Sequence, residues 1–334
     1  MTLAPFASAT PFASLTRTTP ARSLQLRPVP QELVHKLDRS EVLLTGWAPA
    51  GEDRVTVTAQ WPRTHAFYAP AAGNHDPMLL AESLRQCLPL ISHAVYDVPF
   101  GHHLIWQHFS FEIDPDSMGV GGGPTDLQLR ITCSDITRRG GRLAALTMDV
   151  DVLRDDWPVA TAHTRFSCNS PAIYRRLRGE RYTEPGSAFP VPSGASAPVV
   201  VPVLVDREQP GDVVLSPTAV PDQWQLRVDA SHPVLFDHPV DHAPGMLLLE
   251  AARQAAHALH GPFAGEVTPV RFDSAFFRYV EFDSPCLITA RVEPAGSTPE
   301  GTRCVSVTAI QEDATAFTCR VTMAERTGAR HLRH

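Results

Sequence analysis

The sequence predicts an α+β protein that contains two copies of one domain, each an antiparallel sheet curled around a single long helix. One observation is a repeat: the segments 76–86 and 243–254 carry Met, Leu, Leu, Glu, Arg and Gln in the same order, 168 positions apart. A period of about half the chain indicates a duplicated domain. The second observation is the order of elements, because each half places a strand-like run, a loop and one apolar helix before several strand-like runs. A length of 334 residues fits two such domains.

The first domain is expected over residues 29–178, after a disordered tail at 1–28 that holds no Asp or Glu. Its long helix should run from 77 to 96, because Pro77 suits a first helical position and Asp76 can cap it. Apolar residues cover nearly every face of this helix, so we expect other structure to enclose it. Pro89 should kink the helix or end its regular part. The other elements expected are strands at 41–45, 54–61, 102–112, 126–137, 143–153 and 159–169 and a short helix at 171–177.

The second domain is expected over residues 224–326, between a linker at 179–223 and a polar tail at 327–334. The linker is rich in Pro, Gly and Ser and could hold one strand, at 199–205. The second domain then repeats the order of the first. Its expected elements are a strand at 224–229, a loop at 231–244, a helix at 245–259 and strands at 267–282, 285–293, 304–311 and 317–325.

Composition and charge exclude several classes of protein. The net charge of −7 gives no bulk attraction to nucleic acid or to an anionic membrane surface, and no basic helix-turn-helix segment is present. No run of eighteen apolar residues could span a bilayer. The six cysteines are scattered without a C-x-x-C pair, which favours the reduced cytoplasm over a disulfide framework. There is no G-x-S-x-G elbow, Walker loop or dinucleotide-binding glycine motif, and neither a cofactor nor a metal is expected.

Each long helix carries an acid, a guanidinium and an amide on one face. They are Glu82, Arg85 and Gln86 in the first copy and Glu250, Arg253 and Gln254 in the second, at spacings of three and four residues. Burial raises the pKa of a carboxylate, so Glu82 or Glu250 could act as a general base. The alternative is a buried ion pair that only holds the helix in place, and a duplicated fold would duplicate such scaffolding too.

The loop before the second helix concentrates histidines and aspartates. His238 and His242 are four residues apart, but Pro239 and Pro244 argue against a helix there, which disfavours a zinc site. A histidine that feeds a helix N-terminus is better suited to a general base, and His238 is the candidate. The backbone N–H groups that begin either helix, at 245–246 or 78–79, could hold a developing oxyanion.

Several motifs in order resemble a known family. The second loop and helix are similar to the hotdog-fold 3-hydroxyacyl-ACP dehydratases, through Phe236-Asp237-His238-Pro239 and Pro244-Gly245-Met246-Leu247-Leu248-Leu249-Glu250-Ala251. A closer resemblance, over about residues 33–325, is to the AfsA-type family, the γ-butyrolactone (A-factor) autoregulator synthases of actinomycetes. The segments that carry it are 34–36, 41–45, Gln60-Trp61-Pro62-Arg63-Thr64-His65, His75-Asp76-Pro77-Met78-Leu79-Leu80-Ala81-Glu82, 85–86, 98–102 and Asp237-His238-Pro239-Val240-Asp241-His242.

The resemblance implies a tandem (double) hotdog and an acyltransferase. Such an enzyme moves a β-ketoacyl group from acyl carrier protein to the hydroxyl of dihydroxyacetone phosphate, and the ester then cyclises to a butenolide. In hotdog dimers the loop histidine and the helix acid of one site come from different subunits. Carried over, His238 would face Glu82 and His65 would face Glu250.

Phosphate recognition favours arginine, whose planar fork matches two oxygens. The candidates are Arg63, Arg85, Arg253 and Arg271, with Gln86 and Gln254 beside two of them, and Glu82, His238 and Glu250 are the catalytic candidates. Two rival functions stay open: an acyl-ACP thioesterase or dehydratase, and a non-catalytic acyl-binding regulatory protein. A fused double hotdog could stand as a monomer or form a homodimer.

Overall fold

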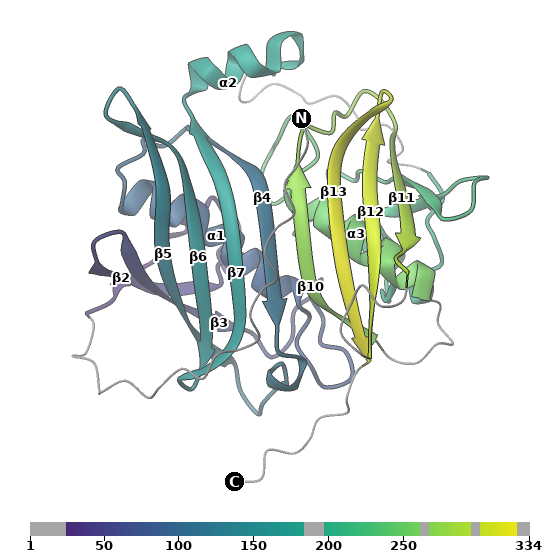
Figure 1. The fold of residues 1–334 in the computed structure, drawn as a ribbon, viewed down its shortest axis with the longest axis horizontal. Coiled ribbons are helices and arrows are strands. Elements are labelled where there is room, and N and C mark those ends of the chain that lie inside the picture. Colours follow the sequence, from purple (N-terminus) through teal and green to yellow (C-terminus); the bar gives the residue numbers. More distant parts are fainter. Residues whose placement is uncertain (1–24, 184–196, 261–266, 295–300, 326–334) are drawn as a thin grey trace.

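Two long helices lie side by side, each enclosed by one half of a continuous sheet (Figure 1). The computed structural model describes residues 25–183, 197–260, 267–294 and 301–325. The helices are α1 (Met78–Ala94) and α3 (Gly245–His260), and the described residues form one antiparallel sheet of 13 strands. The strand order is β1-β2-β3-β5-β6-β7-β4 in the first half, continuing as β10-β13-β12-β11-β9-β8 in the second. This arrangement confirms the α+β prediction of two curled sheets around two helices.

The strands of both halves follow the alternating pattern of the sequence, with one face on the helix and one toward solvent. In the first half they are β1 (Arg27–Pro28), β2 (Leu44–Gly51), β3 (Arg54–Trp61), β4 (His103–Ile113), β5 (Thr125–Arg139), β6 (Arg142–Arg154) and β7 (Trp157–Asn169). In the second half they are β8 (Leu215–Pro217), β9 (Gln223–Leu226), β10 (Val267–Phe276), β11 (Cys286–Val292), β12 (Thr302–Gln311) and β13 (Ala314–Glu325).

The two halves meet where β4 pairs with β10. Phe272 lies opposite Phe111 in this ladder, and their rings stack with centroids 4.9 Å apart. Large apolar side chains are buried where β4 and β10 pair, on the face toward the helices, so that the two halves share one hydrophobic core. The short helix α2 (Pro171–Arg178) crosses one end of this joint (Figure 1).

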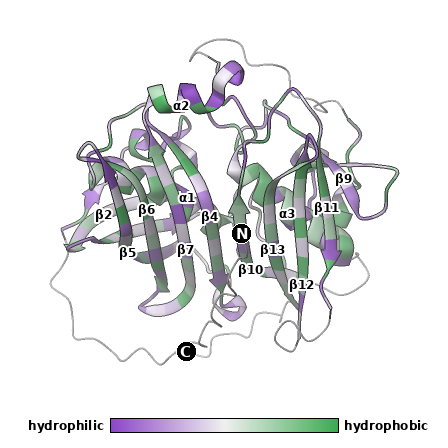
Figure 2. Ribbon diagram, turned by 45° about the horizontal axis from the view of Figure 1, so that its top comes forward, coloured by the Kyte–Doolittle hydropathy of each residue, from purple (hydrophilic) through white to green (hydrophobic). Residues whose placement is uncertain are grey.

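Most residues of α1 and α3 are apolar and buried, which explains why both helices are enclosed; Figure 2 colours the ribbon of α3 largely as hydrophobic. Leu79, Leu80 and Leu84 are fully buried on α1. The helix does not end at Pro89 but continues to Ala94. A proline removes one N–H from the helix ladder, and the surrounding core, in which Pro89 is buried, keeps the helical path through it.

The stretch expected to be a linker is partly folded. The strand predicted at 199–205 is wrong: a 3₁₀ helix occupies Pro202–Val205, followed by the 3₁₀ turn Pro210–Asp212 and by β8. Val205 and Leu215 are fully buried against the core. This order repeats the first half, where the 3₁₀ helix Gln31–Val34 precedes β2.

The ends of the chain fall mainly outside the described residues. The tails predicted at 1–28 and 327–334 lie outside them except for 25–28, where β1 pairs with β2 instead of being disordered. All six cysteines are free and buried. In the described part of the chain, no helix is long and apolar enough to cross a membrane.

Candidate active site

The acid on α1 is held by a cluster that we call the first network: Glu82, Arg85, Gln86 and Lys36. Both carboxylate oxygens of Glu82 accept hydrogen bonds from the Arg85 Nε, at 3.1 and 3.0 Å. The Lys36 Nζ lies 3.2 Å from Oε1, and the Gln86 amide donates to the same oxygen at 2.8 Å. Burial raises the pKa of Glu82, but Arg85, Lys36 and the hydrogen bonds outweigh it and lower the pKa to about 2.

The acid on α3 sits in an equivalent second network: Glu250, Arg253, Gln254 and Arg207. The Arg253 Nε lies 3.0 Å from one carboxylate oxygen of Glu250, and the Arg207 Nε lies 2.9 Å from the other. Burial again raises the pKa of Glu250, and the two guanidiniums again outweigh it and lower the pKa to about 2. The expectation that burial would raise these pKa values toward neutrality is therefore wrong, because each acid is buried together with two cations.

The two amides fasten the segment that leads into each half. Gln86 Oε1 accepts a hydrogen bond from the Leu43 N–H at 3.0 Å, and Gln254 Oε1 accepts one from the Val214 N–H at 2.9 Å. Each amide also donates to a backbone carbonyl of the same segment, at 2.8 Å in both halves. The repeated acid and amide thus form a duplicated scaffold, which is the alternative that the sequence left open.

The two networks differ in charge and in access. Arg253 also pairs with Asp206 at 3.2 Å, and Arg207 lies 3.4 Å from Asp76, so three acids surround the two cations of the second network. In the first network the ion pairs of both cations share a single acid. The Arg85 side chain is 19% exposed, whereas the Arg253 side chain is 2% exposed. The Asp237 carboxylate also acts on Arg85, so the first network is less acidic than the second, and its arginine is more accessible.

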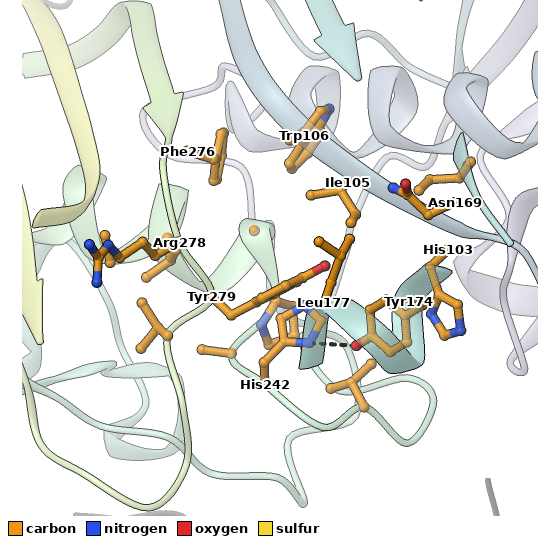
Figure 3. A pocket seen from close by; sticks show the side chains of 18 of the residues that line it. His103, Ile105, Trp106, Asn169, Tyr174, Leu177, His242, Phe276, Arg278 and Tyr279 are labelled. Carbon is orange, nitrogen blue, oxygen red and sulfur yellow. Dashed lines mark hydrogen bonds between the residues drawn. The ribbon is translucent and has the colours of Figure 1, made fainter. Parts of the chain in front are cut away.

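A cavity of about 810 Å³, the central cavity, lies between the two halves (Figure 3). Arg85 lines it, together with residues of β4, α2, the loop before α3 and the first turn of α3; neither Glu82 nor Glu250 does. Its apolar wall fits a hydrocarbon chain. This wall includes Leu88, Pro89, Leu104, Ile105, Trp106, Met246, Leu248, Phe276 and Val280.

The loop histidine expected at the site lines the central cavity beside the first network. Asp237 fastens this loop to the first half, because its carboxylate accepts hydrogen bonds from the Leu37 N–H at 2.8 Å and the Asp38 N–H at 3.1 Å. Burial and then the Arg85 charge lower the pKa of His238, which keeps its imidazole neutral. The loop thus brings His238 toward the Glu82 side, as the resemblance implied.

The expected contact between His65 and Glu250 is not formed. His65 lies 3.4 Å from Glu41 of its own half, and its Nδ1 accepts hydrogen bonds from two backbone N–H groups. The contact across to the second network is made by Arg207, whose Nη1 donates to the Phe67 carbonyl at 2.6 Å. The pairing of His65 with Glu250 is replaced by this arginine bridge.

The sequence analysis named His242 for its spacing from His238 but gave it no catalytic role. His242 Nδ1 lies 2.7 Å from the Asp241 carboxylate, which also accepts hydrogen bonds from the Tyr174 hydroxyl at 2.5 Å and the Arg178 Nε at 3.0 Å. Figure 3 marks a longer contact, 3.4 Å, between the Tyr174 hydroxyl and His242 Nδ1. Burial raises the pKa of Asp241, but hydrogen bonds from His242 and Tyr174 and the Arg178 charge hold it well below its ordinary value. Asp241 therefore stays ionised and fixes the imidazole, leaving Nε2 as the acceptor nitrogen. The available signal was the Asp-His pair three residues before Gly245.

Four buried side-chain atoms of the lining make no hydrogen bond within the described part of the chain. They are the Tyr279 hydroxyl, the Trp106 Nε1, the His102 Nδ1 and the His238 Nδ1. A buried donor without a partner is costly, and functional sites are where such groups persist. Tyr279 packs edge-on against His242, with ring centroids 4.6 Å apart, and Figure 3 shows it beside that histidine.

The N-termini of the two helices are not equivalent as oxyanion sites. At the start of α1 the Asp76 carboxylate accepts a hydrogen bond from the Met78 N–H at 2.8 Å, and its backbone carbonyl accepts one from the Leu79 N–H at 3.0 Å. Pro244 takes the place of this capping aspartate before α3, because its carbonyl accepts the equivalent hydrogen bond, from the Leu247 N–H at 3.0 Å, and its side chain cannot cap. The first-turn residues Gly245 and Met246 line the central cavity, so only α3 presents its first amides there.

Replacing Gly245 with alanine is expected to destabilise the fold by about 1–3 kcal/mol. A Cβ at this position would lie 2.5 and 2.7 Å from two ring carbons of Trp106, which is itself packed against Phe276. Thermal unfolding checks this prediction. Gly211→Ala is the matched control, because a Cβ there meets no atom within 4 Å; equal melting temperatures for the two variants would contradict the packing account.

Two arginines predicted to bind phosphate stand apart from the central cavity. Arg63 is exposed on the loop after β3, and Arg271 lies on β10, where it pairs with Glu112 at 3.2 Å. Neither belongs to the residues that line the cavity. Of the four arginines proposed from the sequence, the structure brings Arg85 to it.

Known proteins match most of the chain. A family model described as an A-factor biosynthesis hotdog domain matches residues 18–170 and 194–325. A Streptomyces virginiae protein named 2-oxo-3-(phosphooxy)propyl 3-oxoalkanoate synthase is 45% identical over 295 residues, which cover 88% of this chain and 96% of that protein. A Streptomyces coelicolor protein of the same name is 42% identical over 293 residues, covering 87% and 90%. A solved structure of a putative oleoyl thioesterase from Lactobacillus plantarum covers 81% of this chain and 95% of its own, with 11% identity and a TM-score of 0.49.

Proposed function

The chain belongs to the A-factor biosynthesis hotdog domain family, and from that membership we propose that it is a 2-oxo-3-(phosphooxy)propyl 3-oxoalkanoate synthase. The product of that name is the ester of a 3-oxoalkanoic acid with dihydroxyacetone phosphate. The enzyme therefore transfers a β-ketoacyl group to the hydroxyl of dihydroxyacetone phosphate. The observation that carries this function is the shared name of relatives that are 42–45% identical over nearly the whole chain.

The donor that we propose is a β-ketoacyl thioester of acyl carrier protein. In the transfer, the hydroxyl oxygen of dihydroxyacetone phosphate attacks the thioester carbonyl carbon. A C–O bond forms, the C–S bond breaks, and the hydroxyl proton ends on the departing thiol. The reaction needs a base for that proton, donors for the oxyanion, a cation for the phosphate and an apolar channel for the chain. The acidic carbon between the two carbonyls of the ester can then attack the ketone of the dihydroxyacetone unit, which forms a C–C bond and, with loss of water, gives a butenolide.

His242 is the base in this proposal, in place of the helix carboxylates. Its Nδ1 is held by the ionised Asp241, which fixes the ring and stabilises the imidazolium that forms when Nε2 takes the proton. Glu82 and Glu250 are ill suited, because each is ionised with a pKa of about 2 and has its oxygens occupied by cations. The carboxylates hold the scaffold, and the loop histidine does the chemistry.

The developing oxyanion is assigned to the first turn of α3 and the Tyr279 hydroxyl. The amides of Gly245 and Met246 begin a helix, and Tyr279 is a buried donor without a partner among the described residues. The chain of the acyl group lies along the apolar wall of the central cavity, which includes Leu88, Ile105 and Phe276. These elements come from both halves, so neither half alone forms the site.

Arg85 and the neighbouring His238 bind the phosphate of the acceptor in this proposal. Arg85 lines the central cavity and belongs to the less acidic of the two networks. A guanidinium can reach two phosphate oxygens at once, and His238 can add a hydrogen bond without adding a second fixed charge. The second network does not line the central cavity and is left as scaffold.

Product analysis tests the function directly. Purified protein is incubated with a 3-oxoacyl thioester, with and without dihydroxyacetone phosphate, and the products are identified by mass spectrometry. A phosphorylated ester that forms only with the acceptor supports the proposal. Free 3-oxo acid or an enoyl product, formed at the same rate without acceptor, would identify a thioesterase or dehydratase instead. No turnover under either condition would favour an acyl-binding regulatory protein.

Replacing Arg85 with methionine is expected to raise KM for dihydroxyacetone phosphate about 10- to 100-fold, because a charge-assisted hydrogen bond contributes about 1.5–3 kcal/mol. The preference for dihydroxyacetone phosphate over dihydroxyacetone should fall by the same factor, since the variant lacks the group that recognises phosphate. Steady-state kinetics with both acceptors measure this. Arg63→Met and Arg271→Met are controls that should leave KM and the acceptor preference unchanged. A larger rise in KM in either control than in Arg85→Met would place the phosphate site at that arginine instead.

A further inference from the structure

A second hollow of about 740 Å³, the arginine groove, adjoins the central cavity. The end of β5, the start of β6, β7 and the beginning of α2 form its walls. Its lining contains Arg139, Arg142 and Arg165, with no aspartate or glutamate among the lining residues. Arg165 lies 3.9 Å from Asp135, so Arg139 and Arg142 supply most of the local reversal of charge in a chain whose net charge is −7.

The positive surface continues from the groove onto α2. Arg175 and Arg176 are exposed on this helix, and Arg138 is exposed at the end of β5. Apolar side chains lie between these charges, since Ile173 is 40% exposed and Leu177 is 57% exposed. Exposed aliphatic side chains rimmed by charges of one sign are typical of a surface that binds a protein of opposite charge.

The groove opens toward the place where chemistry is proposed. His102, Gln107, Ser167 and Asn169 line both the arginine groove and the central cavity. Leu177 of α2 lines the central cavity as well, and Figure 3 shows it with Asn169 at that side. A thioester arm that enters over this wall would bring its carbonyl toward His242 while its carrier stays outside.

We propose that the arginine groove and the outer face of α2 are the docking surface for an acidic acyl carrier protein. This inference rests on the proposed function, which requires a thioester donor. The cations extend over the β5–β6 hairpin, β7 and α2, which is more surface than a single phosphate group would cover. The exposed Ile173 and Leu177 give a protein partner apolar contacts among the charges.

The test reverses charge at Arg139 and Arg142 in the full-length protein. The double variant Arg139→Glu, Arg142→Glu is compared with Arg291→Glu, Arg303→Glu, which changes the same charge on exposed strands of the second half. Each is assayed with one 3-oxoacyl group carried either by acyl carrier protein or by N-acetylcysteamine, a small thiol. Affinity for phosphopantetheinylated acyl carrier protein is measured separately by fluorescence anisotropy.

The groove variant is expected to lose about 10-fold or more in kcat/KM with the carrier-bound donor and in affinity for the carrier. Its activity with the small thioester should match that of the wild type, and the control pair should keep both activities. Equal losses with both donors, unchanged carrier affinity, or an equal loss in the control pair would overturn the docking surface. Wild-type protein that binds the carrier through these arginines but forms no ester would overturn the proposed function and leave the docking surface standing.

Discussion

Replacing His242 with asparagine is expected to lower the acyl-transfer rate about 10²- to 10⁴-fold, the usual contribution of a positioned base. The asparagine can keep a hydrogen bond to Asp241, so the loop should hold its place while the proton acceptor is lost. KM for dihydroxyacetone phosphate should change little, because Arg85 and not His242 is assigned to the phosphate. Single-turnover acyl transfer, followed by acid quench, measures the chemical step without product release.

The molecule supplies a matched control for this prediction. His163 also lies 2.7 Å from a carboxylate, that of Asp149, but on the exposed face of the sheet. His163→Asn should therefore transfer acyl groups at the wild-type rate. Asp241→Asn should fall between wild type and His242→Asn, because the imidazole remains but loses its fixed orientation. A His242→Asn enzyme with an unchanged rate constant would remove this histidine from the mechanism.

The second large effect is on stability. Glu250→Gln is expected to lower the free energy of unfolding by about 3–5 kcal/mol, because it leaves Arg253 and Arg207 buried without their shared counter-ion. The folded fraction of the variant should keep the wild-type kcat, since the carboxylate does not line the central cavity. Urea unfolding measures the first quantity, and activity normalised to the folded fraction measures the second.

The stabilisation by Glu250 is expected to decrease as the pH falls. Glu250 has a folded pKa of about 2 against an ordinary value of 4.5, so the unfolded chain binds the extra proton first as the pH falls. The stabilisation from the ionised carboxylate is complete above about pH 4.5 and is lost as the pH falls toward 2. The stability gap between wild type and Glu250→Gln should close over that window. The control Glu112→Gln, at an exposed pair with Arg271, should cost less than about 1 kcal/mol at any pH.

The sequence predicted the architecture because its strongest signals are periodic. The repeat around Glu82 and Glu250 and the apolar helices gave two enclosed helices and their sheets. What it missed depends on tertiary packing. The helix continues through Pro89 because the surrounding core holds it, and residues 202–217 fold against α3 although their composition is typical of a linker.

The site was harder to predict because a duplicated domain repeats its structural residues as well as its catalytic residues. The acid, arginine and amide recur in both halves, and the structure uses them mainly to hold the entering segment and the helix together. The features assigned to catalysis are those that break the repeat. Pro244 replaces the capping Asp76, the Asp241–His242 pair stands only before α3, and only the first network opens to the central cavity. The number of acids paired with the cations differs between the two networks, and this difference can be seen only in the structure.

The comparison of His242→Asn with Glu250→Gln in single-turnover acyl transfer tests the central claim most directly. If His242 is the base, the rate constant falls by about 10²-fold or more in the histidine variant and stays unchanged, per folded molecule, in the glutamate variant. The reverse order would contradict it: a slow Glu250→Gln enzyme beside a normal His242→Asn enzyme would return the chemistry to the helix carboxylate.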